Sequence, residues 1–138
     1  MKKRLKKPIV LLLVSFSLIF GVSTQASAAD YEFKTEDGRT DGGISFPDWK
    51  NMNVQVDVWG LYGYSSVWGN GTYSPEKLKV RLCNQYTESC TQFKSFTEIK
   101  KGYGRVHFYN VQPKNYYLDI EDTSSFTQVT GYSDAIAY

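Results

Sequence analysis

Two runs of alternating apolar and polar residues, at 104–111 and 116–120, constrain the fold of this chain more than any other feature. In the first run Val106 and Phe108 fall on one side of an extended backbone, and their neighbours fall on the other. This period of two is typical of strands in a sheet that buries one face. Because only a short Pro-Lys-Asn connection at 113–115 separates the runs, we expect them to be neighbouring antiparallel strands.

The same alternation recurs along the chain after residue 28, where no segment keeps a sustained helical spacing of apolar residues. We therefore expect an all-β fold, a small antiparallel β-sandwich of the Greek-key, immunoglobulin-like or prealbumin-like kind. The other expected strands are 53–59, 78–84, 90–96 and a last strand at 128–138 that pairs early in the fold. The side chains expected in the core are Val54, Val56, Val58, Leu78, Val80, Leu82, Val106, Phe108, Tyr116, Leu118 and Ile120.

The first 28 residues have the three parts of a secretory signal peptide. Five Lys and Arg residues lie within 1–7, a mostly apolar run follows at 9–20, and small residues at 26–28 suit a cleavage site. This apolar run is shorter than the roughly 20 residues that a membrane-spanning helix needs. We therefore predict a secreted, extracellular protein without a stable membrane anchor, either associated with the cell wall or free.

Removal of the signal peptide reverses the sign of the net charge. Residues 1–28 contain five of the 16 Lys and Arg residues and none of the 14 Asp and Glu residues, which leaves 11 positive and 14 negative side chains. A nucleic-acid-binding protein needs a clustered basic surface to contact phosphates, so we predict no nucleic-acid partner. The remaining length suits a single domain, with an extended N-terminal arm at 29–50 and a sandwich at 51–138.

The arm is rich in Gly, Asp and Thr, which are typical of turns and irregular chain, with a short edge strand expected at 31–33. Its carboxylates Glu32, Glu36, Asp37 and Asp41 are of the ligand type that calcium prefers. The twelve-residue calcium loop with its closing Glu is absent from the sequence. We therefore expect a solvated acidic arm, and we predict no metal site and no cofactor.

Residues 60–73 combine glycines with large aromatic side chains in a loop or irregular hairpin. Asn70 and Gly71 predict a tight type I′ turn, whose two central positions need a positive φ. Two interpretations of the rings remain open: they stack on a sugar face or a partner's pocket, or they plug the core or cap its open end. We expect Trp68, beside Gly69, to be the most exposed. The candidate binding residues are Trp59, Tyr62, Tyr64, Trp68 and Tyr73.

Cys83 and Cys90 are the only cysteines, and they flank a polar turn. In an exported protein this pair predicts a disulfide across a hairpin, with Cys83 on the outward side of its strand. Closing so short a loop stabilises the fold by roughly 2 to 3 kcal/mol in the chain-entropy model. The spacing matches neither a redox motif nor a zinc site, so a structural role is favoured.

Three segments follow one another in the chain: Leu-Lys-Val-Arg-Leu at 78–82, Gly-Arg-Val-His-Phe-Tyr-Asn-Val at 104–111 and Pro-Lys-Asn-Tyr-Tyr-Leu-Asp-Ile at 113–120. In this order they resemble the strands of Cna B-type and other transthyretin-like (prealbumin-like) sandwich domains, over Leu78 to Asp122. The resemblance implies a β-sandwich that binds at cell surfaces, and it implies no reaction. Some members of that family cross-link a Lys to a late Asn. This chain has no Asn after Asn115, so no such isopeptide bond is expected.

The sequence contains no constellation typical of an enzyme. His107 is the only histidine, and no Gly-x-Ser-x-Gly motif supports a triad with Asp119 and a serine. We therefore expect a non-enzymatic secreted protein, a binding or cell-envelope-associated module whose aromatic loop contacts polysaccharide, the cell-wall surface or another protein. The alternatives are a secreted bacteriocin-like toxin or inhibitor and a small hydrolase.

Overall fold

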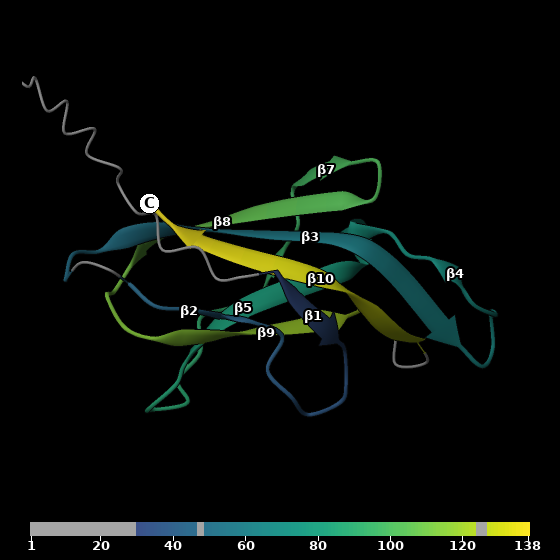
Figure 1. Ribbon diagram of the computed structural model, residues 1–138, viewed down its shortest axis with the longest axis horizontal. Helices are drawn as coiled ribbons and strands as arrows, with labels where there is room; N and C mark the ends of the chain where they lie inside the picture. The colour runs from purple at the N-terminus through teal and green to yellow at the C-terminus, as the bar shows by residue number, and fades with distance from the viewer. Residues whose placement is uncertain (1–29, 47–48, 124–126) are drawn as a thin grey trace, which may run out of the picture.

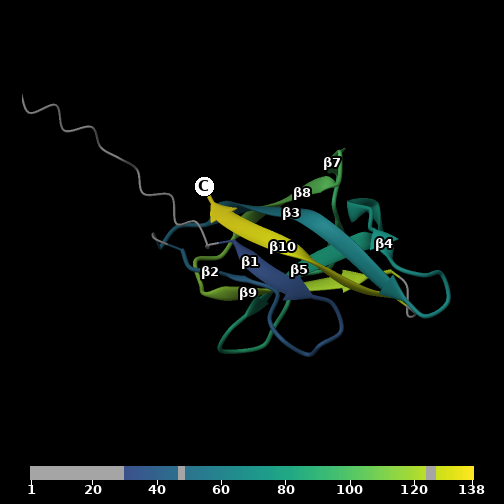
Figure 2. The ribbon, with the colours of Figure 1, turned by 45° about the vertical axis from the view of Figure 1, so that its right-hand side comes forward.

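The strands of this protein form two antiparallel sheets that pack face to face, which confirms the predicted antiparallel β-sandwich. The structure is a computed structural model, and it describes residues 30–46, 49–123 and 127–138. Figures 1 and 2 show the two layers from two sides. The signal peptide predicted for 1–28 lies outside the described residues.

The larger sheet, sheet A, has the strand order β1-β10-β3-β8-β7, and β4 pairs with β3 beside this path. The smaller sheet, sheet B, has the order β2-β9-β5-β6. The bounds in sheet A are β1 Tyr31–Lys34, β3 Met52–Ser65, β4 Gly71–Thr72, β7 Glu98–Lys100, β8 Tyr103–Val111 and β10 Thr127–Ala137. Those in sheet B are β2 Gly43–Ile44, β5 Leu78–Asn84, β6 Lys94–Ser95 and β9 Tyr116–Asp122.

The core lies between the sheets and contains the side chains that the alternation predicted. Val54, Val56 and Val58 of β3 are fully buried, and so are Leu78, Val80 and Leu82 of β5. The predicted core residues of β8 and β9 are also buried, because alternate side chains of a strand point to the same face. The last strand pairs with β1 and β3, as predicted.

The prediction that the two most regular runs form a hairpin is wrong. β8 pairs with β3 and β7 in sheet A, whereas β9 pairs with β5 and β2 in sheet B. The connection at 112–115 therefore crosses from one sheet to the other. In a sandwich the inward faces of both sheets are buried, so the alternation identifies the buried side of a strand without identifying its sheet.

The region between β5 and β8 also differs from the prediction. The strand expected at 90–96 is reduced to β6 and one isolated bridge between Cys83 and Cys90. The expected connection at 97–104 contains β7, which forms a hairpin with β8 around Lys101 and Gly102, both at positive φ. The chain therefore changes sheets between β6 and β7.

The segment predicted as an extended arm contributes a strand to each sheet. β1 pairs with β10 at the edge of sheet A, and β2 pairs with β9 at the edge of sheet B. Between them Asp41 is only 4% exposed, in contrast to the solvated arm that its composition suggested. The Asp41 carboxylate accepts the Ile120 N–H at 2.7 Å, and its carbonyl accepts the Ser133 hydroxyl. Asp41 therefore links the segment to β9 and β10.

Helical structure in the described residues is limited to the 3₁₀ turn η1 at Pro75–Lys77. This turn leads into β5, and the Leu78 N–H donates to the Pro75 carbonyl. No helix in the described part of the chain is long and apolar enough to span a membrane.

Candidate functional site

A groove of about 600 Å³ lies at the end of the sandwich where the β3–β4 hairpin projects. The hairpin is paired through Tyr62 with Thr72 and Gly63 with Gly71. The far wall of the groove is formed by Lys77, from the end of η1, and by Thr123, which follows β9. The site therefore combines side chains from separate parts of the sequence. The lining residues are Gly63, Ser65, Trp68, Gly69, Asn70, Gly71, Thr72, Tyr73, Lys77 and Thr123.

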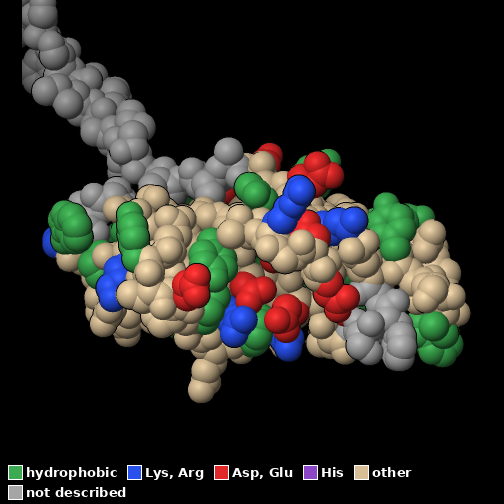
Figure 3. Space-filling view, turned by 90° about the horizontal axis from the view of Figure 1, so that it is seen from below, with side chains coloured by type: hydrophobic (Ala, Val, Ile, Leu, Met, Phe, Trp, Pro, Cys, Tyr) green, Lys and Arg blue, Asp and Glu red, His purple; other side chains and the backbone are tan. Residues whose placement is uncertain are grey.

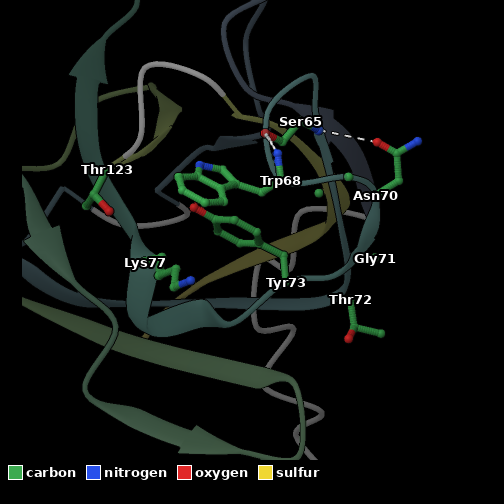
Figure 4. A pocket seen from close by; sticks show the side chains of 10 residues that line it. Ser65, Trp68, Asn70, Gly71, Thr72, Tyr73, Lys77 and Thr123 are labelled. Atoms are coloured by element: carbon green, nitrogen blue, oxygen red, sulfur yellow. Dashed lines mark hydrogen bonds between the residues drawn. The ribbon is translucent and has the colours of Figure 1, made fainter.

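The turn that carries Trp68 is held by its own hydrogen bonds. The Ser65 hydroxyl accepts the N–H groups of Val67 and Trp68 at 3.2 and 3.1 Å, and the Ser65 carbonyl accepts the Gly69 N–H at 3.1 Å. The Asn70 amide oxygen accepts the Ser65 N–H at 3.3 Å (Figure 4). These bonds fix the backbone beneath the indole, which lowers the entropy lost when a ligand binds.

The turn type predicted from Asn70 and Gly71 is wrong. Neither residue has a positive φ, and Gly71 is already the first residue of β4. The left-handed position is Gly69, with a φ of +79°. A longer turn forms because the Ser65 side chain and carbonyl bind the following N–H groups, an interaction that competes with a two-residue turn.

Trp68 and Tyr73 are the aromatic side chains among the described residues of the groove, and Figure 4 shows both among the side chains that line it. Trp68 is 81% exposed, as predicted, whereas Tyr73 is half-buried and packs against the core. The Tyr73 hydroxyl is buried and has no hydrogen-bond partner among the described residues. Burial, followed by the negative charge of Asp122, raises the pKa of Tyr73, so its hydroxyl stays a neutral donor. The Lys77 ammonium lies 5.6 Å from the centre of the Tyr73 ring.

The other three predicted rings lie on a different surface. Trp59, Tyr62 and Tyr64 are on the outer face of sheet A, because Val58 and Leu61 of the same strand point into the core. Tyr62 and Tyr64 pack edge to face with ring centres 5.0 Å apart. The structure therefore divides the five predicted residues between a sheet face and the end groove.

Trp59 also has a partner that the sequence did not indicate. Its ring stacks on Tyr132 of β10, with centres 6.1 Å apart. Gly60 permits this stack, since a Cβ at that position would lie 3.1 Å from the Tyr132 ring. Tyr132 lies far from Trp59 in the sequence, and only the pairing of β10 with β3 brings the two rings together.

His107 belongs to a polar cluster on the outer face of sheet A. Its Nε2 lies 3.1 Å from Glu98 Oε1 and its Nδ1 lies 2.8 Å from the Tyr138 hydroxyl. Asp119 is on sheet B, where it pairs with Arg81 at 2.7 Å, so it cannot join His107 in a triad. The His107 cluster ties β7 and β8 to the end of β10.

A second polar cluster on the same face surrounds Asp57. Arg105 donates to both carboxylate oxygens of Asp57, at 2.7 and 3.0 Å, and to the Tyr103 hydroxyl at 2.6 Å. Burial raises the pKa of Asp57, but hydrogen bonds from Arg105, Tyr103 and Gln55 outweigh it and leave the pKa below its usual value. The cluster links β3 and β8 across the sheet.

The predicted disulfide between Cys83 and Cys90 is present. Cys83 is fully buried, although its strand position placed it on the outward side, because the loop that ends at Cys90 folds back over it. The described residues contain no group of three or more His, Cys, Asp and Glu side chains that could share a metal ion.

Comparison with known proteins assigns no family to this chain: no family model matches it, and no curated protein matches it at a significant level. The function is therefore inferred from the geometry of the molecule.

Proposed function

We propose that this protein is a secreted, non-enzymatic β-sandwich module that binds polysaccharide of the cell envelope through the end groove. The observation that carries the proposal is the Trp68 indole, which is 81% exposed on a turn fixed by hydrogen bonds and lines the same groove as Tyr73. A large apolar ring held in water has lost little conformational freedom before binding and gains contact area when a ligand covers it.

The rest of the lining supports a sugar ligand over an apolar protein segment. Apart from the two rings, the described residues of the groove are glycines and polar residues, with no aliphatic side chain among them. Ligand pockets combine apolar surface with a few placed polar groups. A pyranose matches this pattern, because its C–H face can cover an indole while its hydroxyls meet amide, hydroxyl and ammonium groups.

Three polar groups are suited to orient such a ligand. Lys77 offers an ammonium group beside the Tyr73 ring, and Thr123 offers a hydroxyl on the same wall. The Tyr73 hydroxyl is buried and has no partner among the described residues, so a ligand hydroxyl would satisfy it only where binding shifts the side chains that cover it. We expect sugar hydroxyls to contact all three groups.

The proposal is tested by retention of the purified chain, lacking residues 1–28, on insoluble peptidoglycan, chitin, cellulose, xylan and mannan. Wild-type protein is expected to bind at least one of these polymers. Trp68→Ala should weaken that binding at least tenfold, since a central aromatic contact contributes roughly 2 kcal/mol or more. Tyr73→Phe should weaken it less, because only one hydrogen bond is lost.

The matched control is Tyr109→Ala, which removes an exposed ring, 63% accessible, from the outer face of β8 and far from the groove lining. This variant should bind like wild type, and circular dichroism should show that all variants are folded. The proposal is contradicted when no polymer retains wild-type protein, or when Trp68→Ala and Tyr109→Ala bind equally well.

A further inference from the structure

We infer that the protein carries a second sugar-binding site at the opposite end of the sandwich, so that one molecule bridges two polysaccharide chains. This inference rests on the proposed function, because it assigns the same ligand class to another surface. The site is a cleft of about 370 Å³. Its lining residues are Phe46, Trp49, Tyr86, Pro113, Lys114 and Asn115.

The cleft shares four residue types with the end groove and is more apolar, because it also contains Phe46 and Pro113. Trp49 is 93% exposed, which makes it the most exposed of the large hydrophobic side chains that the structure describes. Tyr86 is 79% exposed, and its hydroxyl accepts the Asn115 side-chain N–H at 3.4 Å. Lys114 supplies an ammonium group, as Lys77 does in the groove. Each end therefore presents a Trp, a Tyr and a Lys together with a side-chain amide.

The wall of the cleft that carries Tyr86 is fixed before any ligand binds. The Asn84 side chain is buried and its amide oxygen accepts the N–H groups of Tyr86 and Thr87 at 2.8 and 3.0 Å. The same loop is closed by the disulfide from Cys83 to Cys90. The disulfide therefore holds the loop that presents Tyr86, in addition to any contribution to the stability of the fold.

The opposite wall is held independently of that loop. The Phe46 ring packs edge to face on Tyr116, with centres 5.8 Å apart. The Tyr116 hydroxyl donates to the Gln112 carbonyl at 3.1 Å, which closes the turn that carries Lys114 and Asn115. A cleft in which Tyr86, Phe46 and the turn at 112–115 are held in place, with Trp49 exposed beside them, is suited to a rigid ligand such as a glycan.

The two sites lie at opposite ends of the same strands. The cleft adjoins Asn115, just before β9, and the groove adjoins Thr123, just after it. The exposed rings Trp49 and Trp68 lie beyond the two ends of the 14-residue β3, which at about 3.4 Å per residue extends about 45 Å along its length. Figure 3 shows exposed hydrophobic side chains at both ends of the molecule and between them, with most of the charged side chains near the middle of that face. A short oligosaccharide would therefore occupy one site at a time, whereas long chains would be cross-linked.

The test uses two probes of the polymer that retains wild-type protein: its hexasaccharide and its soluble long-chain form. In calorimetry wild type should bind two hexasaccharides per molecule. Trp49→Ala and Trp68→Ala should each bind one, and the double variant should bind none. With the long chain, wild type should produce turbidity. Each single variant should abolish the turbidity and still bind the chain through its remaining site, at least tenfold more weakly than wild type because the second attachment is lost.

Three results overturn the inference and leave the proposed function standing. They are a stoichiometry of one for wild type, a stoichiometry of two for Trp49→Ala, or turbidity that persists in Trp49→Ala, which would indicate bridging by a protein dimer. If no polymer binds, both proposals fail. If Trp49→Ala alone abolishes binding, the cleft is the sole site and both bivalency and the proposed groove are wrong.

Reduction of the disulfide provides an independent readout. In Trp68→Ala, which keeps only the cleft, reduction should weaken hexasaccharide binding at least threefold. In Trp49→Ala, which keeps only the groove, reduction should leave binding unchanged. Equal loss at both sites would contradict the role assigned to the loop between Cys83 and Cys90. Circular dichroism of the reduced protein shows whether the sandwich remains folded during the measurement.

Discussion

Replacement of Asp41 by Asn should remove a large pH dependence from the stability of the fold. Burial is the main reason why the pKa of Asp41 rises from 3.8 to about 7, and the negative charges of Asp119 and Asp37 raise it further. The Ile120 N–H, which donates to the carboxylate at 2.7 Å, acts in the opposite direction without compensating for burial.

The sign follows from proton binding. Between pH 4 and pH 7 the folded protein keeps a proton on Asp41 that the unfolded chain has released, so the folded state binds more protons. The contribution of Asp41 to the free energy of unfolding is therefore greatest below about pH 4 and falls as the pH rises to about 7. The gap between the two pKa values is about 3 pH units, which corresponds to a loss of at most about 4 kcal/mol.

The assay is urea unfolding at pH 4.5, 5.5, 6.5 and 7.5 for wild type and Asp41→Asn, with the disulfide intact. Titrations of the other groups are common to both proteins and cancel in the difference between their free energies of unfolding. As the pH rises from 4.5 to 7.5, the free energy of unfolding of wild type should fall by several kcal/mol relative to that of Asp41→Asn. A difference that is independent of pH would refute the reasoning that Asp41 is protonated in the folded protein at mildly acidic pH.

Two further predictions concern the stability of the fold. Replacing both Cys83 and Cys90 by Ser should lower the free energy of unfolding by about 2 to 3 kcal/mol, because the disulfide closes a loop with a sequence separation of 7. A loss under 0.5 kcal/mol in urea unfolding would contradict the chain-entropy argument. Gly104→Ala should cost about 1 to 3 kcal/mol, because its Cβ would lie 2.6 Å from the Pro75 Cβ. Gly71→Ala is the control, because a Cβ at Gly71 would have no atom within 4 Å. Equal melting temperatures of the two variants would show that the close approach at Gly104 is relieved without cost.

The alternation of apolar residues was sufficient to predict β3, β5, β8 and β9 and the face that each of these strands buries. Val54, Val56 and Val58 illustrate this, because a period of two places all three on the same side of β3 whatever strand lies beside it. The partner of a strand depends on the path of the chain, and the short connection before β9 is equally compatible with a hairpin and with a crossover between sheets. The pairing of β8 with β9 was therefore predicted incorrectly.

The candidate site was only partly accessible to sequence analysis. The exposure of Trp68 was predicted because a ring beside a turn glycine has no strand to pack against. The placement of Trp68 and Trp59 on different surfaces was not predicted, since it depends on which face of the hairpin each side chain occupies. Trp49 and Tyr86 are far apart in the sequence, and the only signal at each was a large ring among polar neighbours.

The three tryptophans lie on three different surfaces, so their indole N–H resonances in NMR spectra provide the most direct test of sugar binding at the two ends of the sandwich. Trp68 lies in the groove, Trp49 in the cleft and Trp59 on the outer face of sheet A, stacked on Tyr132. On titration with the hexasaccharide of the retained polymer, the Trp68 and Trp49 resonances should shift, each with its own saturation curve, while that of Trp59 stays in place. A shift confined to Trp59, or no shift at saturating hexasaccharide, would contradict sugar binding at the ends of the sandwich.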